Sequence, residues 1–154
     1  MRRRLVQILL GSALLLPPGL FAASGRVLKV LPQFLDLQGR RALSPSLFDR
    51  DAYQAYLRQH PDRVSGISFD VHWKSHGPVY GPLTLRVELV GTSAGDLPNR
   101  QTLESEVKPG GWFGHWTALQ FSGAPYESLG KITAWRVTLW EGDQMLAEQK
   151  SFLW

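Results

Sequence analysis

The chain has 154 residues, of which 44% are hydrophobic, 11% aromatic and 19% charged. This length fits one domain with a leader, and the aromatic content excludes an ordinary disordered chain. The sequence contains no cysteine, which excludes a disulfide scaffold, a thiolate nucleophile and a cysteine-ligated zinc site. Lysine and arginine outnumber aspartate and glutamate by 17 to 13, giving a formal net charge of +4.

Residues 1–24 have the three-part layout of a secretory signal peptide. Arginines at 2–4 form a positive region, residues 5–21 carry no charge, and residues 22–24 are small enough for cleavage. Prolines at 17–18 interrupt an apolar stretch that is already short for a membrane-spanning helix. We therefore expect a cleaved leader, a periplasmic or secreted protein, and no membrane insertion after cleavage. A leader retained as an anchor is the alternative.

Loss of the leader changes the electrostatics of the chain. Without its three arginines, 14 basic and 13 acidic residues remain, a formal net charge of +1. Arg40 and Arg41 are then the only adjacent basic pair in the sequence. Because nucleic-acid-binding proteins cluster basic residues on one face, we expect no nucleic-acid partner.

The segment 25–64 is predicted to hold one strand and one helix that pack on the rest of the chain. Residues 26–38 favour a strand. Ser44 or Ser46 caps a helix over about 45–59, which Pro61 ends. Helical spacing predicts a buried stripe made of Phe48, Ala52, Ala55 and Tyr56.

The role of this helix stays open at the level of sequence. It either covers an open sheet edge, which sheets commonly need, or docks a partner through Arg50 and Tyr53.

From residue 65 onward the hydrophobic period changes from 3.6 to 2, which is typical of strands. Two clear runs alternate apolar and polar residues at 67–73 and 83–89. A short glycine-containing turn near residue 142 predicts a hairpin. Further strand-like runs fall at 102–108, 116–121, 131–140 and 144–154.

This pattern predicts a mainly β fold of six to seven antiparallel strands with one N-terminal helix. Over residues 65–154 it resembles immunoglobulin and fibronectin type III β-sandwich domains. The resemblance implies a β-sandwich core for this segment and carries no function with it.

No catalytic pattern meets its structural requirement. Residues 91–95 fit G-x-S-x-G, but no helix follows, so we expect an exposed loop and not a nucleophile elbow. Glu104 and Glu106 alternate with apolar residues, as outward side chains of a half-buried strand do. His72 and His76 stand too far apart along a strand to hold one ion. We expect no catalytic residue, no cofactor and no metal.

The segment 108–116 combines one proline and three glycines with large aromatic residues. Loops run over the surface, so Trp112, Phe113 and His115 are candidate contacts with a protein or a glycan. The alternative is that the aromatics plug the open end of a sandwich. Other tryptophans are expected in the core or docked on the sheet: Trp73, Trp116 and Trp135 in the core, and Trp154 docked.

These observations predict a small exported, non-enzymatic domain that binds or scaffolds a macromolecule in the cell envelope or outside the cell. The partner is an unknown protein or glycan. A carbohydrate-binding module is the alternative. A lesser alternative is an enzyme whose site assembles from distant loops, for instance His115 with Asp70 or His72.

Overall fold

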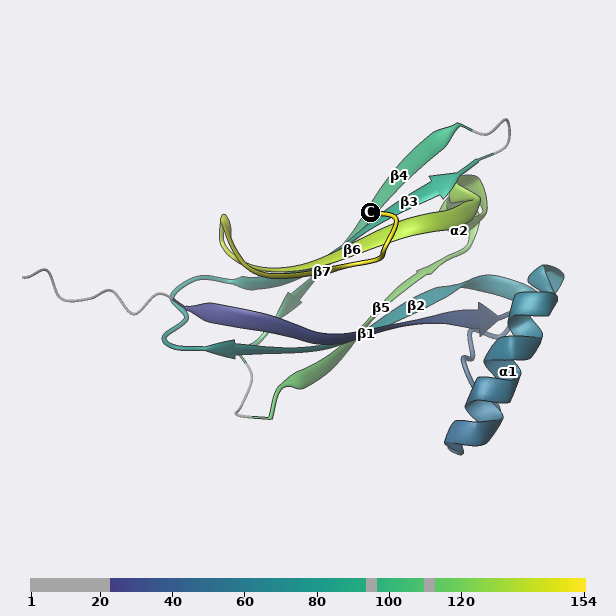
Figure 1. Ribbon diagram of the computed structural model, residues 1–154, viewed down its shortest axis with the longest axis horizontal. Helices are drawn as coiled ribbons and strands as arrows, with labels where there is room; N and C mark the ends of the chain where they lie inside the picture. Colours follow the sequence, from purple (N-terminus) through teal and green to yellow (C-terminus); the bar gives the residue numbers. More distant parts are fainter. Residues whose placement is uncertain (1–22, 94–96, 110–112) are drawn as a thin grey trace, which may run out of the picture.

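The computed structural model describes residues 23–93, 97–109 and 113–154. The expected leader up to residue 22 and the candidate Trp112 lie outside the described residues. Two antiparallel sheets face each other, and the prediction of a mainly β chain with six to seven strands is confirmed (Figure 1). One sheet has the order β1-β2-β5 and the other β4-β3-β6-β7. The strands are β1 (Ser24–Asp36), β2 (Val64–His76), β3 (Leu83–Thr92), β4 (Pro98–Val107), β5 (His115–Ser122), β6 (Lys131–Glu141) and β7 (Gln144–Lys150).

The core forms where the alternating faces of the two sheets meet. Phe69, Val71 and Trp73 of β2 are at most 1% exposed, and they join one apolar cluster with Leu85 and other residues of β3. Burying each such side chain contributes roughly 1.5–3 kcal/mol to folding. The expected core position of Trp73 is thus confirmed, and Trp135 packs against the same cluster in a partly buried position.

Helix α1 (Leu47–Gln59) ends where the sequence predicts and begins two residues after the predicted start at 45. Ser46 is its N-cap and accepts a hydrogen bond from the backbone N–H of Asp49 at 3.4 Å. The helix ends before Pro61, which opens the 3₁₀ turn Pro61–Arg63. In Figure 1 the helix lies at one end of the β1-β2-β5 sheet.

The predicted buried stripe of α1 is wrong. Phe48 is 81% exposed and Tyr56 is 42% exposed, whereas Gln54 and Leu57 are the buried residues of the helix. Gln54 is buried because its amide meets backbone groups of β1 and not an apolar surface. Hydrophobicity therefore gives no signal for the burial of Gln54, and Leu57 is the only apolar residue of the helix that is fully buried.

A second helix, α2 (Ala124–Leu129), lies between β5 and β6 and was not predicted from the sequence. Its last residue, Leu129, is fully buried and packs against Gly91 of β3, where an added Cβ would lie 2.5 Å from the carbonyl oxygen of Leu129. Six residues are too few to display a helical period, so this element had no sequence signal.

The C-terminal part follows the predictions in its hairpin and in Trp154, but β7 ends at Lys150 and not at 154. β6 and β7 form the expected hairpin, with Gly142 at φ +53° in the turn. After β7, Trp154 docks on the outer face of the four-stranded sheet. The guanidinium carbons of Arg100 and Arg136 lie 5.5 and 5.9 Å from its ring centroid.

Candidate functional site

Exposed aromatic side chains gather where the chain enters β5. We call His72, Phe113, His115 and Trp116 the aromatic edge. Among the described residues β5 hydrogen bonds to β2 alone, so it is an edge strand of its sheet. Phe113 is 89% exposed, in agreement with the expectation of a surface loop.

Trp116 is 55% exposed, so its expected core position is wrong. Leu119 and Phe121 point into the core, and side chains alternate along a strand, so Trp116 belongs to the outer face. There it lies opposite His72 of β2, with ring centroids 4.8 Å apart and planes within 8°. The stack orients the indole and leaves half of its surface accessible.

Gly114 fixes the backbone of the aromatic edge. Its φ is +80°, and an added Cβ would lie 2.7 Å from the carbonyl oxygen of Trp73. The imidazole Nε2 of His72 lies 3.3 Å from the carbonyl oxygen of Phe113. The chain therefore runs tightly against β2, and the exposed ring of Phe113 stands on an anchored backbone.

His115 lies on the other face of the sheet, opposite Trp73, with ring centroids 5.8 Å apart. A shallow hollow of about 300 Å³ lies between the end of β4 and the start of β5. Ser105, Glu106 and Thr117 contribute polar groups to its lining, and Trp116 contributes aromatic surface.

Asp70, His72 and His115, the residues of the enzyme alternative, do not come together in one site. Asp70 and His72 share the outer face of β2, but the carboxylate of Asp70 is paired with Arg41 and accepts a hydrogen bond from Ser68 at 2.9 Å. His115 stands on the opposite face of the sheet from both. Glu104 and Glu106 point outward on β4, as predicted.

In residues 23–93, 97–109 and 113–154, no three His, Asp or Glu side chains are grouped so that they would hold a metal ion. Over the same residues, no helix has the length and apolar character needed to cross a membrane.

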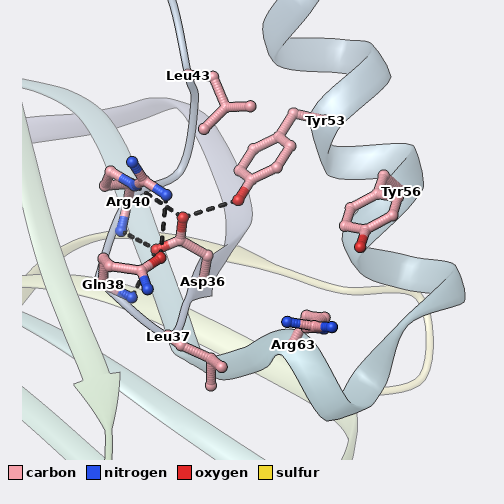
Figure 2. Close-up of a pocket in the computed structure, with 8 residues that line it drawn as sticks. All are labelled: Asp36, Leu37, Gln38, Arg40, Leu43, Tyr53, Tyr56 and Arg63. Carbon is pink, nitrogen blue, oxygen red and sulfur yellow. Dashed lines mark hydrogen bonds and ion pairs between the residues drawn. The ribbon is translucent and has the colours of Figure 1, made fainter.

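A second concave site lies between α1 and the turn that follows β1 (Figure 2). We call it the Asp36 pocket. It measures about 470 Å³ and is lined by Asp36, Leu37, Gln38, Arg40, Leu43, Tyr53, Tyr56 and Arg63. About nine residues of β2, or roughly 30 Å, separate this end of the sheet from the aromatic edge.

Asp36 is 3% exposed, and its carboxylate accepts four hydrogen bonds. Its Oδ1 accepts from the backbone N–H groups of Gln38 at 2.9 Å and Arg40 at 2.8 Å. Its Oδ2 accepts from Arg40 Nε at 2.9 Å and from the Tyr53 hydroxyl at 2.7 Å. The carboxylate thereby ties the end of β1, the following turn and α1 together.

The electrostatics follow from this network. Burial by itself would raise the pKa of Asp36, but the hydrogen bonds from Arg40, Tyr53 and Gln38 outweigh it and hold the pKa below 3.8. Burial and the bond to Asp36 raise the pKa of Tyr53 above 10. Asp36 is thus an ionised structural group at neutral pH.

From sequence, Tyr53 is a candidate for docking a partner, whereas Asp36 and Arg63 were not predicted as site residues. The one available signal was the placement of Asp36 shortly before Gly39, since aspartate side chains commonly bond backbone N–H groups in turns. The chain matches no protein-family model, no curated protein and no solved structure.

Proposed function

We propose that this chain is a small exported, non-enzymatic domain that binds a macromolecule in the periplasm or outside the cell through the aromatic edge. The observation that carries the proposal is the pair of exposed rings at the start of β5. Phe113 and Trp116 expose 89% and 55% of their surface, next to a fixed backbone. Rigid exposed aromatics give large contact area at low entropic cost, and they dominate binding energy at interfaces.

The finer fold type is part of this proposal. We infer an immunoglobulin-like sandwich in which β1, β2 and β5 correspond to A, B and E. The opposite sheet, ordered β4-β3-β6-β7, then corresponds to C′-C-F-G. Domains of this class present loops and edge strands to partners, which supports a binding role by analogy of fold only.

Export rests on the leader. β1 begins at Ser24, and Ala23 before it is 8% exposed. Cleavage after Ala22, one of the sites that the sequence offers, would therefore leave β1 complete. The N-terminal peptide of the protein from cells, identified by mass spectrometry, tests this. A mature chain that starts between residues 23 and 25 supports export, and an intact Met1 would contradict cleavage.

The binding surface is tested by a photo-crosslinking amino acid placed at Phe113 and expressed in cells. The matched control places the same group at Phe48, which is 81% exposed at the other end of the molecule. We expect a reproducible adduct from position 113 that is absent from position 48. Adding Trp116→Ser should remove it. Identical adducts from both positions, or none from 113, would overturn the role of this surface.

A glycan ligand is the second candidate, and the hollow of about 300 Å³ beside Trp116 favours it. An aromatic face next to Glu106, Ser105 and Thr117 offers the stacking and hydrogen bonding that sugars need. A glycan array tests this candidate. The glycan candidate is supported if Trp116→Ala abolishes binding and Tyr80→Ala leaves it unchanged. Tyr80 is the control because it is an exposed aromatic residue outside the hollow. Silence across the array would reject it.

A further inference from the structure

The Asp36 pocket contains N–H groups that make no hydrogen bond within the described part of the protein. Its one carboxylate, in contrast, already accepts two hydrogen bonds on each oxygen. All four hydrogen bonds to the Asp36 carboxylate come from within the protein. Arg40 uses Nε for Asp36 and Nη2 for Gln38 at 3.0 Å, and a guanidinium carries five N–H groups in total. A ligand that enters therefore finds donors and no free carboxylate.

Arg63 adds a second positive charge to the same pocket. Its Nε lies 3.5 Å from Asp62, and both side chains are more than half exposed, so this ion pair is weak. Figure 2 shows Arg63 across the pocket from Arg40. The lining charges, two arginines against one aspartate, leave the pocket net positive.

The remaining walls are apolar and accessible. Leu37, Leu43 and Tyr56 are 56%, 62% and 42% exposed around this one concavity. The size of the hollow, about 470 Å³, lies within the range of small-molecule sites. A ligand complementary to both features has an anionic group and an apolar body.

We propose that the Asp36 pocket binds a small organic anion with an apolar body, such as an aryl-substituted carboxylate. Arg63 and the remaining N–H groups of Arg40 hold the anionic group, and Leu37, Leu43 and Tyr56 contact the apolar body. Asp36 does not touch the ligand. It holds Arg40 in place and neutralises part of its charge. The site is separate from the aromatic edge, so either can fail without the other.

The test is an NMR titration of the ¹⁵N-labelled domain with 3-phenylpropionate at neutral pH. We expect saturable shifts confined to residues 36–43 and 53–63, with a Kd on the order of 1 mM. The neutral analogue 3-phenylpropanamide lacks the charge, and inorganic phosphate lacks the apolar body. Each should bind at least about tenfold more weakly.

Paired variants locate the site. Arg63→Gln should weaken binding about tenfold, whereas Arg58→Gln, on α1 but outside this pocket, should leave it unchanged. Leu43→Ser should weaken binding several-fold, and Leu47→Ser, similarly exposed but outside the pocket, should not. The backbone spectrum of each variant reports its folding.

Three results would overturn the proposal. The first is the absence of saturable shifts with 3-phenylpropionate, 4-methylpentanoate and phenyl phosphate, which vary the apolar body and the anion. The second is equal affinity for the acid and its amide. The third is equal loss of affinity in Arg63→Gln and Arg58→Gln.

Discussion

Gln54 of α1 pairs with both backbone groups of Phe34 in β1. Its Oε1 accepts a hydrogen bond from Phe34 N at 2.8 Å, and its Nε2 donates to Phe34 O at 2.9 Å. One glutamine thus acts as a neighbouring strand would, on the edge of β1 that β2 does not occupy. Of the two roles that the sequence left open for the helix, edge protection is the one these contacts support.

Gln54→Leu should destabilise the protein by about 2–3 kcal/mol, because it leaves partly buried backbone groups of Phe34 and Arg41 without their partner. Urea unfolding measures the loss, and hydrogen exchange should rise near residue 34. Gln59→Leu, exposed on the same helix, should change stability by no more than about 0.5 kcal/mol. Equal effects of the two would mean that the helix is not held by Gln54.

Asp36→Asn should cost about 2 kcal/mol, because the amide cannot accept the bonds that Arg40 Nε and Tyr53 donate to Oδ2. Tyr53→Phe removes one of these bonds and should cost about 1 kcal/mol. The control is Asp51→Asn, whose side chain is 77% exposed and should be nearly neutral. Thermal unfolding of the three variants at pH 7 gives the ranking.

Acid should remove the contribution of Asp36. Its pKa in the folded protein lies below 3.8, the ordinary value, so its ionised form stabilises the folded state above about pH 4. That stabilisation falls away as the pH drops through the folded-state pKa. The free energy of unfolding should therefore decline less steeply below pH 4 in Asp36→Asn than in the parent. Parallel curves would show that Asp36 does not contribute.

The two tryptophans at neighbouring register positions should respond very differently to truncation. Trp73 is 1% exposed and donates from Nε1 to Thr117 at 2.9 Å, so Trp73→Ala should cost about 3–5 kcal/mol. Trp116→Ala should cost less than about 1 kcal/mol, since more than half of its surface is already in water. A loss of several kcal/mol for Trp116 in calorimetry would place it in a core role after all.

Gly39 and Gly130 share a positive φ and differ in their surroundings. Gly130 has φ +72°, and an added Cβ would lie 2.2 Å from the carbonyl oxygen of Thr92. Gly39 has φ +74° and nothing within 4 Å of that position. Gly39→Ala should cost about 1 kcal/mol from backbone strain, and Gly130→Ala about 1–3 kcal/mol more from the clash. Chemical denaturation of both variants measures the two costs, and equal costs would refute the close approach at Gly130.

Local sequence signals were enough to predict the β-rich class, the inward faces of β2 and β3, and the presence and end of α1. These features depend on neighbours a few residues apart: alternation in a strand, and a serine cap and a proline stop for the helix. Alternation along β5 also predicts the outward position of Trp116, because Trp116 lies an odd number of residues before the core residue Phe121.

Tertiary structure decided the sites. Asp36 meets Tyr53 across 17 residues, and Arg41 meets Asp70 across 29. Gln54 of α1 is buried because it meets the backbone of β1, whereas Leu57 is the one apolar residue that the helix buries. Pairings of this kind depend on which elements the fold brings together, and the hydrophobic pattern records the burial of apolar side chains and not the partners of polar ones.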